Sequence, residues 1–151
     1  MRSQRRGHIV NVASVAGKIA APFLGAYSAS KFALAAVSDA LRAELAGSEI
    51  AVSTIYPGLT ETSFLDHSQR EVDIPQPPPF ARFVPAAVVA TRIAQAVRWN
   101  LRDVYVSPED VMAVALHTVA APVVDWGMRL WMGSPGPVSS PSPSPSAAPR
   151  E

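Results

Sequence analysis

Two short apolar runs on either side of one long helical pattern restrict the fold of this chain more than any other feature of its sequence. Ile9 to Val12 is a β-branched run that predicts a strand buried on both faces. From Tyr27 to Leu45 apolar residues recur at helical spacing, and Gly47 is placed to end that helix. Ile50 to Tyr56 predicts a second strand, which Pro57-Gly58 stops. Strand, helix and strand in this order predict a right-handed crossover and a parallel sheet covered by helices.

The rest of the chain continues this alternation after a long irregular segment. Leu59 to Val84 is rich in proline, and a loop of that length in a compact domain usually serves as a lid or a binding loop. Pro85 suits the first turn of a helix. Asp103 to Pro108 predicts a third strand. Pro108 to Met132 predicts a helix with a break near Pro122, so the predicted fold class is α/β.

The length of the chain sets its domain organisation. A chain of 151 residues predicts one domain, which we place at residues 1–133. Residues 134–151 are low in complexity and rich in Pro and Ser, so they predict a disordered tail.

Composition argues against several classes of function. The formal net charge of +1 gives no electrostatic reason to expect nucleic acid as a partner. The chain has no cysteine, which excludes disulfides, thiolate metal sites and cysteine nucleophiles. Its three histidines lie far apart without ligand-like spacing, so we expect no metal site.

The sequence gives weak signals for targeting or membrane insertion. Residues 1–17 combine basic and apolar residues as a secretory signal does, but His8, Asn11 and Ser14 interrupt the apolar run. Val111 to Val124 is the nearest candidate for a membrane span, and it is shorter than the ~20 apolar residues that a span needs. We therefore expect a cytoplasmic protein.

A tyrosine and a lysine are placed for proton transfer at the start of the long predicted helix. Tyr27 and Lys31 are four residues apart, so their side chains project from one face of that helix. An ammonium beside a tyrosine favours the phenolate, which is the tuning that a general acid or base requires. Ser14 lies just past the first predicted strand, and ligands of open α/β sheets bind at the carboxyl ends of strands. Its hydroxyl could bond a carbonyl or alcohol oxygen that the tyrosine protonates or deprotonates.

A tyrosine four residues before a lysine is weak evidence by itself, because a core-edge tyrosine beside a solvated lysine gives the same pattern. The combination of this pair with a serine after one strand and a Pro-Gly turn after the next favours catalysis. Ser28 and Ser30 are nearby hydroxyls that could be confused with Ser14. Asn11 lies within the strand that precedes the serine, and we interpret it as a strand residue bonded to neighbouring backbone.

The stretches HIVNVASVAGKIAAPFLGAYSASKFAL and IAVSTIYPGLTET resemble the short-chain dehydrogenases/reductases, a family with a Rossmann-type fold. The strand-end serine, the tyrosine–lysine pair and the Pro-Gly turn with its threonine are hallmark motifs of that family. The resemblance implies that Tyr27 is the general acid/base, that Lys31 supports it and holds the nicotinamide ribose, and that Ser14 orients the carbonyl. It also implies that four further residues line the nicotinamide end of the cofactor: Pro57, Gly58, Thr60 and Thr62.

The resemblance further implies hydride transfer between NAD or NADP and an alcohol/ketone or alcohol/aldehyde pair. It implies that the chain holds the C-terminal part of a doubly wound parallel sheet, with the N-terminal cofactor-binding half absent. None of the eight glycines forms the glycine-rich turn that binds a pyrophosphate. The residue that selects NAD or NADP and the asparagine of the family's catalytic tetrad would be missing with that half. We therefore expect an exposed sheet edge, marginal stability and no measurable NAD(P)H binding by the chain as given.

Phe64, Phe80 and Phe83 in the predicted loop indicate an apolar substrate, and they fit equally well a loop that packs on the body. In the family, the helix from Tyr27 to Leu45 often contributes to a dimer interface, so we expect a homo-oligomer of the full-length protein. One alternative is an inactive fragment that acts only as an interaction or dimerisation module. Another is an epimerase or dehydratase that uses the same three residues and the nicotinamide cofactor.

The C-terminal end of the last predicted helix allows two interpretations. It could make a peripheral contact with a membrane surface or cover the substrate site. It could also pack on the body or in a subunit interface. The residues concerned are Trp126, Met128, Leu130, Trp131 and Met132.

Overall fold

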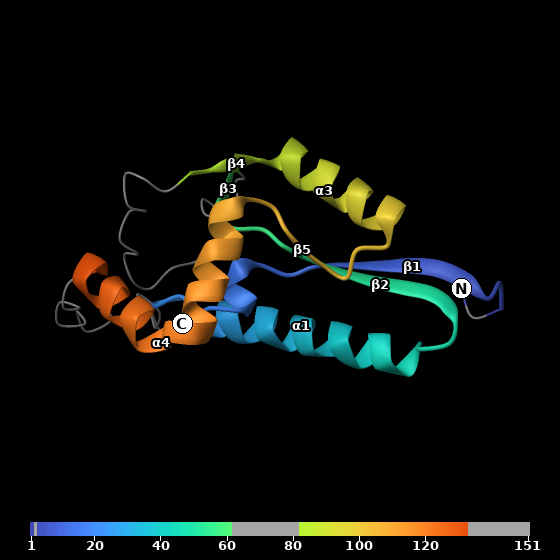
Figure 1. The fold of residues 1–151 in the computed structure, drawn as a ribbon, viewed down its shortest axis with the longest axis horizontal. Coiled ribbons are helices and arrows are strands. Elements are labelled where there is room, and N and C mark those ends of the chain that lie inside the picture. The colour runs from blue at the N-terminus through green and yellow to red at the C-terminus, as the bar shows by residue number, and fades with distance from the viewer. Residues whose placement is uncertain (2, 62–81, 133–151) are drawn as a thin grey trace, which may run out of the picture.

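The computed structural model describes residue 1, residues 3–61 and residues 82–132. Figure 1 shows the strands β1, β2 and β5 between two helices, with α3 along one face of the sheet and α1 along the other. The elements follow one another as β1 (Arg6–Val12), the 3-10 helix η1 (Val15–Gly17), α1 (Gly25–Glu44), β2 (Glu49–Tyr56), β3 (Thr60–Glu61), β4 (Val84–Pro85), α3 (Ala86–Trp99), β5 (Asp103–Tyr105) and α4 (Pro108–Met132).

The main sheet is parallel, as the sequence predicts. Its strand order is β1-β2-β5, with β2 in the middle. Ile9 is in register with Val52, and Tyr56 is in register with Tyr105. All three strands therefore finish at the same end of the sheet, where α4 begins (Figure 1).

β1 is less buried than the sequence predicted, which was a strand buried on both faces. Within residues 3–61 and 82–132 it pairs with β2 alone, so it lies at an edge of the sheet. Its interior residues are half-buried, and Val12 is 42% exposed. The prediction was wrong for β1 because a β-branched run does not reveal how many neighbours its strand has. Full burial occurs instead in the central strand β2, in which residues 52–56 are all buried.

A small core lies on each face of the sheet. On the α3 face it is made of residues from β2, α3 and the β5 segment: Ile55, Ala96, Val104 and Val106. On the α1 face the buried residues come from the end of β1, from α1 and from β2: Ala13, Ala35 and Tyr56. Both cores are close to the carboxyl ends of the strands, so this end of the sheet is the better packed one.

The helices begin and end close to the predicted residues. α1 runs from Gly25 to Glu44, and Gly47 follows with a φ of 85°, in the left-handed region that favours glycine. Pro85 is the residue that caps the N-terminus of α3. The predicted break in α4 is confirmed, because Ala120 has a non-helical φ of −145° just before Pro122.

The ends of the predicted irregular segment are ordered. Thr60 of β3 is in register with Val84 of β4, and the two short strands are parallel. The boundaries Leu59 and Val84 were therefore wrong by a few residues at each end. Residues 62–81, with Phe64 and Phe80, lie outside the described residues, and so do residues 133–151.

α4 has the predicted bounds, Pro108–Met132, but it is a better candidate for a membrane span than the sequence analysis allowed. Pro108–Leu130 has a mean hydropathy of 1.4, and by length and composition it is the one helix among the described residues that could cross a membrane. None of its most apolar window is buried. The prediction that no segment reaches the required length was wrong, because it took the apolar stretch to end at Val124, whereas the apolar part of the same helix extends to Leu130.

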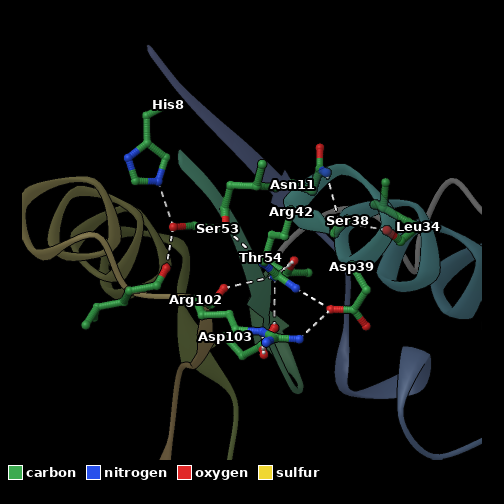
Figure 2. A network of polar contacts seen from close by, with 12 residues as sticks. His8, Asn11, Leu34, Ser38, Asp39, Arg42, Ser53, Thr54, Arg102 and Asp103 are labelled. Carbon is green, nitrogen blue, oxygen red and sulfur yellow. Dashed lines mark hydrogen bonds and ion pairs between the residues drawn. The ribbon is translucent and has the colours of Figure 1, made fainter. Parts of the chain in front are cut away.

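Arg42 joins α1 to two strands of the sheet (Figure 2). Its guanidinium donates to the Val52 carbonyl oxygen at 3.0 Å and to Thr54 Oγ1 at 2.6 Å. It also reaches the Asp103 carboxylate at 3.1 Å and pairs with Asp39 on its own helix. Because the Arg42 side chain is only 14% exposed, solvent screens these charge-assisted bonds little, and they fix how α1 lies on β2 and β5.

Asn11 is bonded to a helix and not to neighbouring backbone. Its Nδ2 donates to Ser38 Oγ at 2.8 Å, and that hydroxyl donates to the Leu34 carbonyl oxygen at 2.7 Å (Figure 2). The interpretation from the sequence was therefore wrong, because the crossover brings buried Ser38 of α1 within reach of β1. The contact ties the edge strand to the helix that carries the candidate proton-transfer pair.

Candidate active site

Ser14 lies in the tight turn that follows β1 and begins η1. Its Oγ accepts a hydrogen bond from the Ala16 amide at 3.1 Å and donates to the Pro57 carbonyl oxygen at 3.2 Å. The Val15 amide donates to the same Pro57 oxygen at 2.9 Å. The turns after β1 and β2 are therefore bonded to each other, and Ser14 lies against the Pro57-Gly58 turn, as the sequence predicts for neighbouring parallel strands.

Tyr27 and Lys31 lie in the first two turns of α1, on the face that their spacing predicts. The Lys31 ammonium is 5.6 Å from the centre of the Tyr27 ring, which is within the range of a cation–π contact. The same ammonium donates to the Val12 carbonyl oxygen at 3.2 Å. Since Val12 is the last residue of β1, the pair lies at the strand end that leads to Ser14.

The two serines near the pair have other partners. Ser28 is 2% exposed, and its Oγ accepts from the Ala21 amide at 3.1 Å, which ties the loop before α1 to the helix. Ser30 Oγ donates to the Tyr27 carbonyl oxygen at 2.7 Å. Of the three hydroxyls that the sequence left in competition, Ser14 is the one in contact with the Pro57-Gly58 turn.

The Pro57-Gly58 turn leads directly into β3. Thr60 Oγ1 donates to the Gly58 carbonyl oxygen at 3.3 Å, so the side chain of this threonine folds back on the turn. Thr62 lies outside the described residues. Of the four residues expected at the nicotinamide end of a cofactor, Pro57, Gly58 and Thr60 follow within four residues of the end of β2, and Pro57 is bonded to Ser14.

Gly58 also faces the first turn of α4. A Cβ atom added at Gly58 would lie 3.0 Å from Cγ of Asp110 and closer still to one of its carboxylate oxygens. Asp110 is held in place there, because its Oδ2 accepts from the Ser107 amide at 3.0 Å while Ser107 Oγ accepts from the Asp110 amide at 3.2 Å. Ser107 and Asp110 thus cap the N-terminus of α4 reciprocally. The Asp110 carboxylate fixed in this way packs against Gly58, so Gly58 is where α4 meets the turn.

The sequence pattern identifies Tyr56 only as the last residue of a predicted strand. It is fully buried, and its ring stacks on Tyr105 with centroids 5.2 Å apart. The Lys18 ammonium lies 4.8 Å from the Tyr56 ring centre. Among the described residues its hydroxyl has no hydrogen-bond partner. Burial, with the Asp103 carboxylate, raises the pKa of Tyr56 to about 12. Tyr56 is therefore a neutral packing residue beneath the Pro57-Gly58 turn.

The described residues offer no group of three or more His, Asp or Glu side chains that could hold a metal ion. His8 Nε2 is 2.7 Å from Ser53 Oγ, and Ser53 in turn donates to the Leu101 carbonyl oxygen (Figure 2). This histidine links β1, β2 and the turn before β5, at a distance from the strand ends that carry Ser14.

Comparison with known proteins relates this chain to one enzyme family. Residues 1–73 match the model of the family described as short chain dehydrogenase. "Dehydrogenase/reductase SDR family member 7B" of Xenopus tropicalis is 52% identical over 63 residues, which cover 42% of this chain and 20% of that protein. "Uncharacterized oxidoreductase YbbO" of Escherichia coli is 49% identical over 88 residues, or 55% of this chain and 33% of that protein. A "3-ketodihydrosphingosine reductase" of Bacteroides thetaiotaomicron is 43% identical over 67 residues.

Solved structures agree on the fold. A short chain dehydrogenase/reductase of Burkholderia phymatum in complex with NAD superposes with a TM-score of 0.65 at 25% identity, over 93% of this chain and 54% of that one. A short chain dehydrogenase of Burkholderia cenocepacia in complex with NADP gives the same TM-score over 82% of this chain and 47% of that one. The chain thus spans about half the length of these proteins and a third or less of the curated relatives. The expected fold class, part of a doubly wound Rossmann-like parallel sheet, is confirmed.

The raised pKa of Tyr56 predicts a loss of stability at high pH. Burial holds this phenol neutral to about pH 12 in the folded chain, whereas in the unfolded chain it ionises near 10.0. Between these values the folded state binds more protons than the unfolded state, so the free energy of unfolding decreases as the pH rises. Urea unfolding at a series of pH values from about 8 to about 12 should show this decrease, and Tyr56→Phe should remove most of it.

Tyr105→Phe is the matched control, since burial also raises the pKa of Tyr105 and its removal should reduce the decrease by a smaller amount. At neutral pH Tyr56→Phe should raise the free energy of unfolding by about 1 kcal/mol, because it removes a buried hydroxyl that has no described partner. An unchanged alkaline decrease in Tyr56→Phe would contradict this account of the Tyr56 environment.

Proposed function

We propose that this chain, which belongs to the short-chain dehydrogenase/reductase family, carries the catalytic half of an oxidoreductase that interconverts an alcohol and a ketone or aldehyde with NAD or NADP. The observation that supports this most is the bonding of the Ser14 turn to Pro57, with Lys31 bonded to the end of the same strand. A hydroxyl, a tyrosine–lysine pair and a Pro-Gly turn thereby belong to one end of a parallel sheet, where ligands of such sheets bind.

In the proposed reduction Tyr27 acts as the general acid. The nicotinamide, when bound, supplies the hydride that adds to the carbonyl carbon. The Tyr27 phenol gives its proton to the carbonyl oxygen, which becomes the alcohol hydroxyl, and the tyrosine is reprotonated from solvent. In oxidation the same groups act in reverse, with Tyr27 as the base. The Ser14 hydroxyl has a single O–H donor, so it rotates from the Pro57 carbonyl oxygen toward the substrate in order to hold the carbonyl oxygen in line with the phenol.

Lys31 is proposed to serve both the tyrosine and the cofactor. An ammonium has three N–H donors, and the Val12 carbonyl takes one of them. The other donors suit the ribose hydroxyls, and the ammonium lies 5.6 Å from the centre of the Tyr27 ring, next to the proposed proton donor. Pro57, Gly58, Thr60 and Thr62 are proposed to line the nicotinamide end, as the resemblance implies. The choice between NAD and NADP stays open, since one solved relative holds each.

An apolar substrate is the proposed class. Phe83, next to β4 and close in sequence to the Thr60 pairing, is 41% exposed and available to contact an apolar group. The Bacteroides thetaiotaomicron relative is named for the reduction of 3-ketodihydrosphingosine. Both observations support a ketone or alcohol that carries an apolar chain.

The second candidate function is an interaction or dimerisation module without catalysis, and the outer face of α1 supports it. Small and apolar side chains recur there at helical spacing, all of them exposed: Ala29, Phe32, Ala33, Ala36, Val37 and Ala40. Such a stripe suits packing against a second helix of its kind. The same stripe supports a homo-oligomer of an active enzyme, so it does not by itself decide between the two functions.

We also propose that α4 touches a membrane surface from the cytoplasmic side. Large apolar side chains of this helix are exposed along its length, among them Leu116 at 46%, Val119 at 83% and Trp126 at 63%. The helix meets the length and composition of a span, but the break at Ala120 and Pro122 favours a helix that lies in the interface.

The oxidoreductase proposal predicts that Tyr27→Phe abolishes turnover and leaves cofactor binding intact. Removal of the proton donor should lower kcat at least about 100-fold, because general acid–base groups contribute on that order. The complete gene product is assayed for NADH and NADPH oxidation with aliphatic ketones, and for cofactor binding by calorimetry. Ser30→Ala is the control, since Ser30 only caps the local helix backbone.

Turnover by Tyr27→Phe within a few fold of the unaltered protein would reject the acid/base role. A complete gene product that binds neither NADH nor NADPH, yet forms a dimer that Val37→Asp dissociates, would favour the interaction module. Val37 is 52% exposed on α1, so this change tests the interface without entering the core.

The membrane proposal predicts that the protein floats with phosphatidylcholine vesicles in a density gradient. Leu116→Asp with Val119→Asp should weaken this binding about tenfold or more, because two apolar side chains would no longer leave water. Thr118→Asp adds a charge to an exposed position on another side of the helix and should have a smaller effect. Equal flotation of the double variant and the unaltered protein would rule out α4 as the contact.

A further inference from the structure

η1 packs against α1 with no side chain between the two backbones at Gly17. Gly17 is buried, and a Cβ atom added there would lie 2.8 Å from the Lys31 carbonyl oxygen and 2.9 Å from its carbonyl carbon. Real Cβ atoms essentially never come so close to other atoms. Because the obstacle is helix backbone and not the end of a flexible side chain, a larger residue at Gly17 must push η1 and α1 apart.

The requirement for glycine comes from this contact and not from backbone conformation. Among the described glycines only Gly47 has a positive φ, so the backbone of Gly17 lies outside the left-handed region. Gly25, eight residues further along, has nothing within 4 Å of an added Cβ. The two glycines lie on either side of the same loop, Gly17 buried in η1 and Gly25 exposed at the start of α1, and only at Gly17 would a methyl group collide with backbone.

Both sides of the Gly17 contact carry residues of the proposed site. On one side the Gly17 amide donates to the Ser14 carbonyl oxygen at 2.8 Å, so the two residues belong to one rigid turn. On the other side the contact is with the main chain of Lys31 itself. The closest approach of η1 to α1 thus sets how far the serine turn lies from the lysine and its helix.

The hydrogen bonds around the contact hold η1 and α1 together, but they do not determine the minimum distance between the two backbones. Ser28 Oγ accepts from the Ala21 amide at 3.1 Å, and the Lys31 ammonium reaches the Val12 carbonyl oxygen at 3.2 Å. The Lys31 bond runs through a long side chain that can adjust to small shifts. The contact of Gly17 with the Lys31 main chain has no such freedom, because interiors are close-packed and backbone shifts only with its whole element.

We propose that Gly17 is a positioning residue that sets the separation between the Ser14 turn and the Tyr27–Lys31 pair through its contact with the Lys31 backbone. The proposal rests on the proposed function in that these residues are taken to act on one substrate. Gly17 touches neither substrate nor cofactor in this account. It acts by letting the serine turn approach the helix closely enough for both to reach the same carbonyl oxygen.

Gly17→Ala, with Gly25→Ala as the matched control, tests the proposal in the complete gene product. Gly17→Ala should lower kcat about tenfold to 100-fold per folded molecule, since displacements near 1 Å have effects on that order. It should also raise the KM for the cofactor, because Lys31 moves with its helix. The folded fraction is measured by circular dichroism, so that a loss of folded protein is not counted as a loss of kcat. Gly25→Ala should keep both constants within about twofold of the unaltered protein.

Amide NMR of the same two variants provides a readout that does not depend on turnover. Gly17→Ala should shift the amide resonances of Lys31 and of Ser14 on the opposite side of the contact, whereas Gly25→Ala should leave both in place. Unshifted resonances, or a Gly17→Ala variant whose kcat per folded molecule matches that of Gly25→Ala, would overturn the proposal. If the unaltered protein shows no turnover but the resonances shift as expected, the positioning contact stands and the oxidoreductase function is what fails.

Discussion

The carbonyl oxygen of Pro57 accepts two hydrogen bonds from the turn after β1, one from the Val15 amide at 2.9 Å and one from Ser14 Oγ at 3.2 Å. The adjacent Ala13 amide donates to the Ile55 carbonyl at 2.8 Å, so these bonds continue the ladder between the two strands past their ends. Ser14 can therefore not move relative to the Pro57-Gly58 turn without breaking the pairing. The rest of the proposed site depends on this connection, because it fixes the substrate-facing hydroxyl to the turn expected to line the nicotinamide.

The second constraint is how α1 lies against this strand end. Arg42 bonds the far part of the helix to β2 and β5, while Asn11 bonds its middle to β1 through Ser38. Near its N-terminus the contact with Gly17 brings the main chain of Lys31 against η1. Three contacts along one helix leave it little freedom to slide or rotate. Lys31 of the pair is thereby held at the end of β1, with its ammonium 3.2 Å from the Val12 carbonyl oxygen.

Much of this arrangement follows from the sequence, for identifiable physical reasons. The spacing of Tyr27 and Lys31 fixes their common face, and a proline or glycine after an apolar run ends an element locally, as Pro57-Gly58 does for β2. Both are local signals that do not need the rest of the fold. An exposed sheet edge was expected from the family resemblance, and β1 forms one within the described residues. The Asn11–Ser38 bond and the buried neutral Tyr56 depend on which elements become neighbours, and no local pattern carries that information. The bounds of α4 and its break near Pro122 were predicted correctly, but its suitability as a membrane span was missed because only Val111 to Val124 was considered.

Hydrogen exchange at the Val15 amide tests the central connection most directly. If Val15 donates to Pro57 as described, its amide should exchange as slowly as those of β2 between Val52 and Tyr56, because both are released only when the strand ends separate. Exchange of Val15 at the rate of an exposed loop amide, with β2 still protected, would contradict the account, since the Ser14 turn would then not be held against Pro57.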